Sequence, residues 1–250
     1  IGIKKPSGRI GLYEPLMEHC VAPEITTLDA DQPSIYESAF ISYGKGGCYF
    51  DEIGEYQLRA IYHSLDGSLV ISDTLSFRVK APHNSTDEDV ADLLLGHEQG
   101  TLFYLLGSDS EFLKNGNKAF DTLISDYREH PLAVYAHLAK GINAGRMFKS
   151  ISEDKTVSIR APQYKEAVSQ LSVVVDKSEK EKGADNITLN MVMMRMAADQ
   201  KASGDSKAAK ETAERMVQIF EKKSLRPHVM QLIESQAKEI IEAPGRKKRA

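Results

Sequence analysis

The chain has 250 residues, of which 41% are hydrophobic and 27% charged, and its formal net charge is −4. This length suffices for one large core or two small ones, and the composition excludes collagen-like, disordered and disulfide-scaffold proteins. The slight acidity argues against a nucleic-acid-binding protein, because phosphate binding requires a basic face.

The chain begins at Ile1 and contains no apolar run long enough to cross a membrane. We therefore expect no signal peptide and no membrane span in this sequence. Since the first residue is not Met, we expect a processed form or an excised piece of a larger protein.

The composition changes near Pro82. Residues 1–86 contain 7 Lys and Arg against 11 Asp and Glu, whereas the remaining residues contain 25 of each. Aromatic residues are concentrated before this point and methionines after it, which favours strands first and helices second. We predict a β domain over residues 1–82, a linker and helix cap over 83–86, and an α domain over 87–243. A disordered basic tail is expected over 244–250.

In the first domain, apolar residues alternate with polar ones from Tyr36 to Val79. A period of two with one apolar face is typical of an antiparallel sandwich. Asp66-Gly67 stands between two alternating runs and predicts a tight hairpin turn.

One stretch is more specific than this alternation. Gly54 stands two residues before Tyr56, which opens a strand and resembles the tyrosine corner of immunoglobulin-like sandwiches. The resemblance implies that the Tyr56 hydroxyl bonds to the backbone upstream while its ring enters the core. An antibody-type domain is excluded because the chain has no Trp and Leu58 stands where the cysteine would be. The short domain is expected to lack its first strand.

After Pro82 the apolar period changes to 3.6, which predicts a series of helices. Ser85 and Glu88 form a capping-box pattern, so we expect the first helix to begin there. Three prolines, Pro131, Pro162 and Pro227, stand where later helices should begin.

The helices form a weak internal repeat. Its segments begin near Lys118, Gln163 and Lys207, separated by about 44 residues. The spacing of Tyr164, Ala167 and Leu171 resembles tetratricopeptide repeats, which implies an all-α solenoid of helical hairpins. A plain antiparallel bundle would give the same amphipathic faces and stays open as an alternative.

Residues able to carry out catalysis do not converge in the sequence. The seven histidines show no His-x-x-x-His pair, and neither Cys-x-x-Cys nor Gly-x-Ser-x-Gly occurs. We therefore expect no catalytic residue, no metal and no cofactor.

The two cysteines, Cys20 and Cys48, allow one disulfide within the β domain. Two buried thiols are the alternative, because free cysteine is among the most buried residue types.

Two further groups could bind a ligand. Met191 and Met194 belong to a methionine cluster that would suit a peptide-binding surface, although packing in the core explains the same cluster. Exposed rings at Tyr36, Tyr43, Tyr49 or Phe50 could bind carbohydrate.

Together these features predict a non-enzymatic interaction or scaffold protein, part of a larger secreted or surface protein of bacterial type outside the cytoplasm. The helical domain would present a surface to a protein or peptide, and solenoids often bind partners in this way. Two alternatives stay open: accessory domains of an enzyme whose catalytic domain lies upstream of Ile1, and carbohydrate binding by the sandwich.

Overall fold

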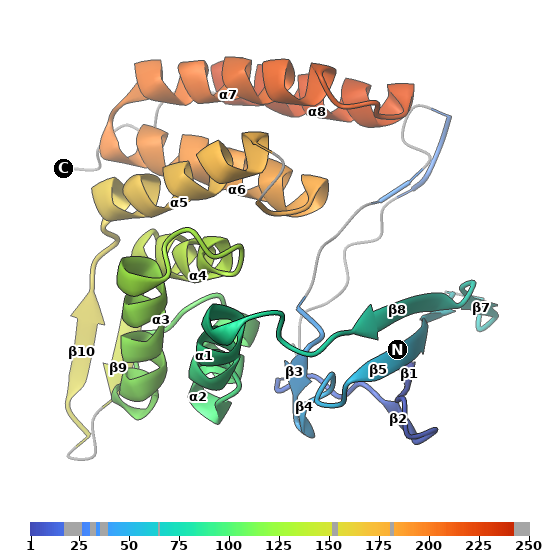
Figure 1. Ribbon diagram of the computed structural model, residues 1–250. Coiled ribbons are helices and arrows are strands. Elements are labelled where there is room, and N and C mark those ends of the chain that lie inside the picture. Colours follow the sequence, from blue (N-terminus) through green and yellow to red (C-terminus); the bar gives the residue numbers. More distant parts are fainter. Residues whose placement is uncertain are drawn as a thin grey trace.

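A computed structural model gives the arrangement of strands and helices (Figure 1). Antiparallel strands occupy the N-terminal part and helices the C-terminal part, which confirms the predicted order of the two kinds of structure. The structure describes residues 1–17, 27–30, 34–35, 40–64, 66–151, 155–180 and 183–242.

The N-terminal part is built on a four-stranded antiparallel sheet of strand order β2-β1-β5-β8. Its strands are β1 (Gly2–Lys4), β2 (Ile10–Leu12), β5 (Gly54–Arg59) and β8 (Leu75–Val79). One face carries the buried side chains of Ile3, Tyr56 and Leu58. Phe50 and Phe77 pack against this group, and the Tyr56 and Phe77 rings stack with centroids 5.5 Å apart.

Two short hairpins accompany the sheet. The first joins β3 (Tyr43–Gly44) to β4 (Gly47–Cys48), and the second joins β6 (Ile61–His63) to β7 (Leu69–Ile71). The β6–β7 hairpin continues β5 and β8 beyond a bulge. Leu58 pairs with Leu75, and Ile61 pairs with Ile71. The two residues between Leu58 and Ile61 therefore lie opposite the three residues between Ile71 and Leu75.

An immunoglobulin-like sandwich is not confirmed, because no second sheet packs face to face on the first within the residues that the structure describes. The expectation that every alternating apolar residue faces a core is wrong for several positions. Tyr62, Leu69, Ile71 and Leu75 are all more than half exposed. The reason is that burial needs an opposing layer, and none of the described segments covers these residues.

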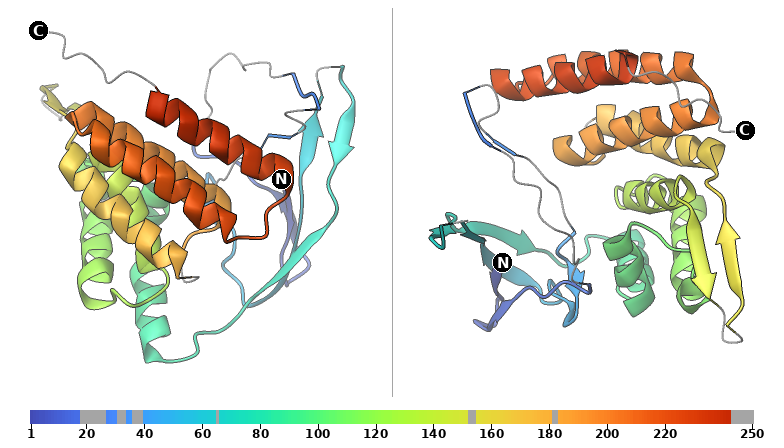
Figure 2. Two further views of the ribbon diagram at one scale, coloured as in Figure 1. Left: turned by 90° about the horizontal axis from the view of Figure 1, so that it is seen from above. Right: turned by 180° about the vertical axis from the view of Figure 1, so that it is seen from behind.

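The C-terminal part contains eight α-helices among the described residues. They are α1 (Ser85–Leu94), α2 (His97–Leu105), α3 (Lys114–Asp126), α4 (Ala133–Ala144), α5 (Tyr164–Glu179), α6 (Asn186–Ser203), α7 (Ser206–Glu221) and α8 (Pro227–Glu242), with a 3-10 turn at Glu111–Leu113. Each helix from α4 to α8 packs on the next, and α8 also contacts α6. Figure 2 shows the resulting stack from above and from behind.

The cap of α1 differs from the predicted one. Asn84, one residue before Ser85, accepts a hydrogen bond from the Asp87 backbone N–H at 2.9 Å through its side-chain oxygen. The prediction of Ser85 as the cap is therefore wrong, and the helix begins two residues before the predicted boundary at 87. Asparagine caps a helix at least as well as serine, so the pattern alone could not choose between them.

The helical part is not all-α, which corrects the prediction. Between α4 and α5 the chain forms an antiparallel hairpin of β9 (Phe148–Ile151) and β10 (Val157–Arg160). Residues 152–154 lie outside the described residues. The β-branched residues Val157 and Ile159 suit an extended strand, and Arg160 fastens the hairpin to the end of α4 through the contacts given below.

The helical part has two apolar clusters. The larger is centred on α4 to α8 and includes Leu138, Leu171, Met193 and Phe220, all at most 1% exposed. The smaller cluster lies among the helices α1, α2, α3 and α4 and includes Val90, Leu102, Phe120 and Ala136. None of the described helices is both long enough and apolar enough to pass through a membrane.

Candidate binding surface on the helical stack

The N-terminal ends of α4, α6 and α8 lie on the side of the stack that faces the β part (Figure 1). We call this side the inner face and define it by Phe103, Tyr135, Asp185, Asn190 and Arg226. Burial and then the nearby Asp185 carboxylate raise the pKa of Tyr135, so Tyr135 of α4 lies near the cap residue of α6. Two cavities lie on the inner face, one lined by Tyr135 and the other by Asp185.

The first cavity has a volume of about 270 Å³ and lies between the β3–β4 hairpin and α2 and α4. Phe40 enters it from the β part: its ring stacks on Phe103 at a centroid distance of 6.1 Å and meets Tyr135 edge-on at 5.8 Å. The walls are mostly apolar and consist of Phe40, Ser42, Tyr43, Cys48, Phe50, Leu94, Leu95, Gly100, Phe103, Leu132 and Tyr135.

Direct contacts hold the β part against α2. The Tyr43 ring lies on Gly100, where a Cβ atom would overlap the ring, and its hydroxyl hydrogen-bonds to Nδ1 of His97. The Tyr104 hydroxyl donates to the Met17 carbonyl at 3.1 Å and accepts from the Met17 N–H at 3.3 Å. These contacts position Phe40 and the first cavity relative to the helices.

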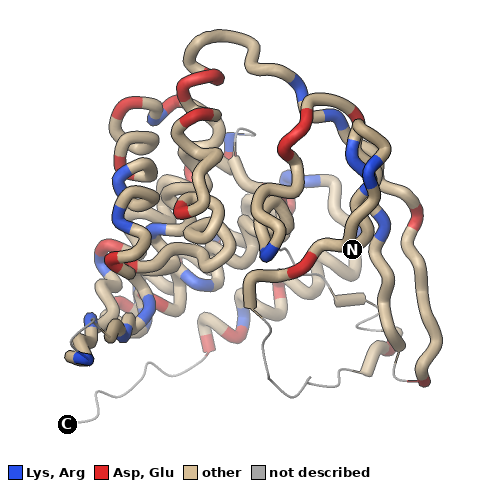
Figure 3. The backbone as a smooth tube through the Cα atoms, turned by 90° about the horizontal axis from the view of Figure 1, so that it is seen from below, with Lys and Arg blue, Asp and Glu red and all other residues tan. Residues whose placement is uncertain are grey.

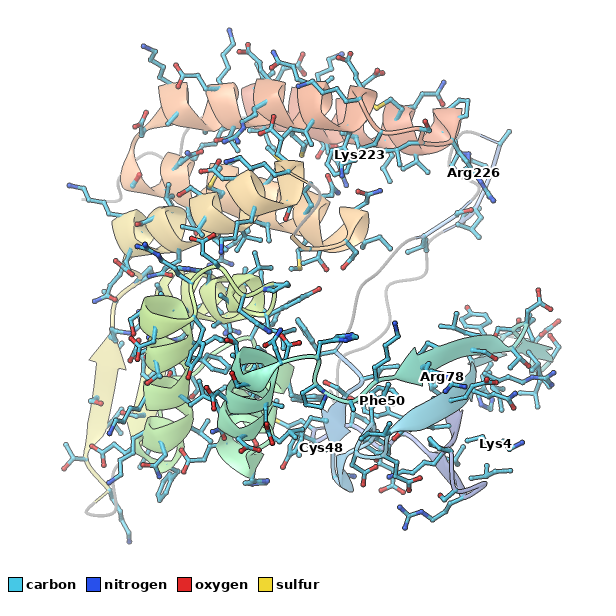
Figure 4. The ribbon with its side chains drawn as sticks, in the orientation of Figure 1. Lys4, Cys48, Phe50, Arg78, Lys223 and Arg226 are labelled. Atoms are coloured by element: carbon cyan, nitrogen blue, oxygen red, sulfur yellow. The ribbon has the colours of Figure 1, made fainter. Side chains whose placement is uncertain are left out.

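Cys48 forms part of the wall of this cavity and lies next to Phe50 between the sheet and the helices (Figure 4). Burial, followed by the neighbouring Asp51 carboxylate, raises the pKa of its thiol. A raised pKa reduces the thiolate fraction and therefore the reactivity. Cys20, its predicted disulfide partner, lies outside the described residues, so the pairing stays a prediction.

The second cavity is larger, about 580 Å³, and lies between the N-terminal ends of α6 and α8. Its walls combine six apolar with six polar residues, and most of the accessible wall is apolar. The lining residues are Asp185, Asn186, Ile187, Asn190, Phe220, Ser224, Leu225, Arg226, Val229, Leu232, Ile233 and Gln236.

Three polar residues of the second cavity have distinct roles. The Asp185 carboxylate caps α6 by accepting from the Ile187 and Thr188 N–H groups at 2.9 and 3.0 Å. Burial opposes its charge, but the hydrogen bonds from Thr188 and Ile187 keep the pKa of Asp185 below its ordinary value. Asn190 donates to Gln236 at 3.0 Å, while no described group donates to its Oδ1.

The turn between α7 and α8 carries three cations, Lys222, Lys223 and Arg226, of which the last two are labelled in Figure 4. The Arg226 side chain belongs to the lining of the second cavity and is exposed. A cavity with apolar walls and a few polar groups at the rim can hold an apolar side chain and orient the polar backbone attached to it.

The two predicted methionines are placed less favourably for binding. Met191 and Met194 are half-buried and pack against the larger apolar cluster, while Met193 and Met196 are buried within it. None of them is among the residues that line either cavity. Met191 and Met194 therefore contact the core with part of their surface, and a role in binding stays a prediction.

Gly54 and Tyr56 lie in the sheet, away from the inner face. The Tyr56 hydroxyl donates to the Glu52 carbonyl at 3.0 Å and accepts from the Glu52 N–H at 2.7 Å. Gly54 has a φ of 138°, and a Cβ there would lie 2.7 Å from Cβ of Pro6. The two hydrogen bonds between the Tyr56 hydroxyl and Glu52 are the upstream backbone contact that the resemblance to a tyrosine corner implies.

The described rings among those proposed for carbohydrate binding do not form an exposed platform. Tyr43 is 4% exposed, and Tyr49 and Phe50 pack against the core of the sheet. Tyr36 lies outside the described residues. A sugar would need an exposed aromatic face, which Tyr43 does not offer.

A group of three arginines, missed by the sequence analysis, fixes the ends of α2 and α4. Arg146 donates to the carbonyls of Leu105 and Gly107 at 3.0 and 3.2 Å. Arg160 pairs with Asp109 and donates to the Asn143 carbonyl at 2.9 Å. The third, Arg195, bonds to Asp199 and to the Gly145 carbonyl. Burial, then Arg195 and Arg160, lower the pKa of Arg146.

These arginine contacts join residues up to 51 positions apart in the chain. A local pattern carries no signal for such pairs, which is why the sequence did not indicate them. Their donors satisfy helix-end carbonyls, so the group has a structural role.

Across the described part of the chain, no group of three or more His, Cys, Asp or Glu could hold a metal ion. Comparisons with family models, curated proteins and solved structures find no match to this chain. Only its own geometry therefore bears on its function.

Proposed function

We propose that the protein is a non-enzymatic interaction module whose helical part binds an extended protein segment along the inner face. The observation that carries this proposal is the position of Phe40. A side chain from outside the helical part is inserted between Phe103 of α2 and Tyr135 of α4, so this face already accepts an aromatic group from another part of the chain.

The second cavity extends the same face and supplies the binding capacity. With about 580 Å³ it can hold one or two large apolar side chains. Arg226 and the side-chain amides of Asn190 and Gln236 belong to its lining, and they would meet the polar backbone of the bound segment. We expect a partner whose apolar side chains enter the cavity and whose carboxylates lie near Arg226.

The proposed architecture is a tetratricopeptide-like stack of hairpins. Contact of α6 with α8 as well as with α7 supports it, since helices in such stacks touch the equivalent helix of the next hairpin. Gly141 of α4 supports it too, because a Cβ there would lie 2.7 Å from the Leu171 side chain of α5. Small residues at such points allow two helices to approach closely.

A selection of displayed random peptides on the immobilised full chain tests the proposal. We expect peptides that bind the wild-type protein and lose at least about tenfold in affinity on Tyr135→Ala or Arg226→Ala. Lys207→Ala is the matched control, because this side chain at the start of α7 is 88% exposed and lies outside both cavities.

Thermal unfolding of each variant must first show that the fold is kept. The proposal is wrong if selection yields no specific peptide, or if the selected peptides bind both inner-face variants as tightly as the Lys207 control.

A further inference from the structure

The β6–β7 hairpin, which we call the ribbon, is an exposed apolar element of the N-terminal part. Ile61 and Tyr62 of β6 are 45% and 65% exposed, and Leu69, Val70 and Ile71 of β7 are 56–57% exposed. Both faces of the ribbon are therefore open to solvent, and it projects from the sheet away from the helices (Figures 1 and 2).

The hydrogen bonds of the ribbon show which backbone groups are free. Ser72 donates to Ala60 and Ser64 donates to Ser68, so these two pairs are of the hydrogen-bonded kind. In an antiparallel ladder such pairs alternate with open ones. Tyr62 and Val70 then bond to each other, whereas the N–H and C=O of Leu69 and Ile71 point away from β6.

The outer side of β7 is the accessible edge. Strand β5 pairs with β1 on one side and with β8 on the other, so β1 and β2 flank the side on which β6 lies. Among the described strands none pairs with the outer side of β7 or β8. An open edge runs from Leu69 to Val79.

The charges of the ribbon do not protect this edge. Soluble proteins commonly place Lys or Pro on exposed edge strands to prevent pairing with another chain. From Ala60 to Phe77 this chain has neither Lys, Arg nor Pro, and its charged residues there are Asp66 and Asp73. In Figure 3 no Lys or Arg lies on the described part of the ribbon.

We propose that a second copy of this chain pairs with the ribbon, β7 against β7 and antiparallel, about a two-fold axis at Val70. Leu69 of one copy then lies opposite Ile71 of the other, and each such pair exchanges two backbone hydrogen bonds. The four ribbon strands become one sheet in which every side chain of the paired β7 strands is apolar.

A second copy is the occupant that this sequence favours. The Leu69–Val70–Ile71 segment is its own complement under the two-fold operation, because no charged side chain opposes another within the paired strands. A basic edge strand of another protein would find favourable charges only at Asp66 and Asp73, and both lie outside the Leu69–Val70–Ile71 segment. The ribbon is small beside the roughly 800 Å² per partner of a standard interface, so the dimer should be weak and concentration-dependent.

Sedimentation velocity of the full chain, from the micromolar to the hundreds-of-micromolar range, tests the proposal. We expect a reversible monomer–dimer equilibrium. Ile71→Pro removes an edge N–H without breaking a bond to β6, and should raise the dissociation constant at least about tenfold.

Two matched variants distinguish pairing at the β7 edge from nonspecific hydrophobic association. Ile61→Pro removes the corresponding N–H on the β6 side and should leave the equilibrium unchanged. Phe112→Lys removes a 75% exposed ring on the helical part and should also leave it unchanged. Far-UV circular dichroism must match the wild-type spectrum for all three variants.

The inference is overturned if the wild-type chain stays monomeric over the whole range, or if Ile71→Pro dimerises like the wild type. If Ile61→Pro dissociates the dimer and Ile71→Pro does not, the contact lies on the β6 edge and the β7 pairing is overturned. Because none of these residues belongs to the inner face, peptide binding can fail while dimerisation holds, and the reverse.

Discussion

Gly100 lies in the middle of α2 directly against the ring of Tyr43, and a Cβ atom at position 100 would overlap that ring. Glycine inside a helix costs about 1 kcal/mol relative to alanine. Its presence here is explained by the close approach of the β part, which no larger residue would permit.

Gly100→Ala should therefore destabilise the protein despite its better helix propensity. Overpacking typically costs about 1–3 kcal/mol, and we expect the free energy of unfolding in urea to fall by an amount in that range. The double variant with Tyr43→Ala is the control, because the added methyl group then has room. A Gly100→Ala protein that is more stable than wild type would contradict the proposed contact.

Tyr56→Phe removes the hydroxyl that bonds to both backbone groups of Glu52. Because Tyr56 is fully buried, the N–H and C=O of Glu52 lose a partner that water cannot easily replace. We expect a loss of about 1–3 kcal/mol in the free energy of unfolding, measured by urea denaturation. Tyr62→Phe on the ribbon is the matched control and should change stability by less than about 0.5 kcal/mol. Equal effects of the two substitutions would count against the tyrosine corner.

His137 should make stability depend on pH. It is 8% exposed in α4, and its Nδ1 hydrogen-bonds to Gln170 at 2.6 Å. Burial lowers the pKa of His137 below its ordinary value of 6.5, while the Gln170 bond opposes this effect. The unfolded chain then binds a proton at a higher pH than the folded one, so stability falls as the pH drops below about 6.5.

The difference between wild type and His137→Gln isolates this contribution. The free energy of unfolding of the wild type should fall more steeply than that of the variant between about pH 7 and pH 5. Above this window the difference between the two proteins should stay constant, which serves as the internal control. Parallel curves over the whole range would show that His137 does not titrate differently on folding.

Arg160→Lys tests the arginine group at the end of α4. Lysine keeps the charge but loses the planar fork that reaches Asp109 and the Asn143 carbonyl together. We expect a loss of about 1.5–3 kcal/mol in the free energy of unfolding. Arg128→Lys is the control, since its 77% exposed side chain pairs with the exposed Glu129 and should change stability by less than about 1 kcal/mol. If Arg160→Lys behaves like this control, the guanidinium contacts do not fasten the β9–β10 hairpin.

Local patterns in the sequence predicted a considerable part of this structure. The change of period at Pro82 separated strands from helices, and the spacing of Phe120 and Leu123 placed one apolar face of α3, where both are fully buried. Asp66-Gly67 predicted the turn between β6 and β7, where Gly67 has a φ of 83°. These features succeed because turns and helix faces depend on neighbours within a few residues.

The same patterns failed where burial depends on distant segments. Leu69 and Ile71 alternate like core residues and yet are exposed, because alternation records which side chains share a face and not whether another layer covers that face. Met191 and Met194 were candidates for a binding surface and pack against the larger apolar cluster, a contact that depends on helices remote in sequence.

The sequence by itself determined that strands come first and helices second, and it placed the apolar face of helices such as α3. Only the tertiary structure decided where the inner face lies and which edge of the sheet stays open. Phe40 reaches Phe103 across more than sixty positions of the chain, and Arg160 reaches Asp109 across 51. Such contacts depend on the path of the whole chain, because side chains remote in sequence meet only after the helices have stacked and the sheet has docked against them.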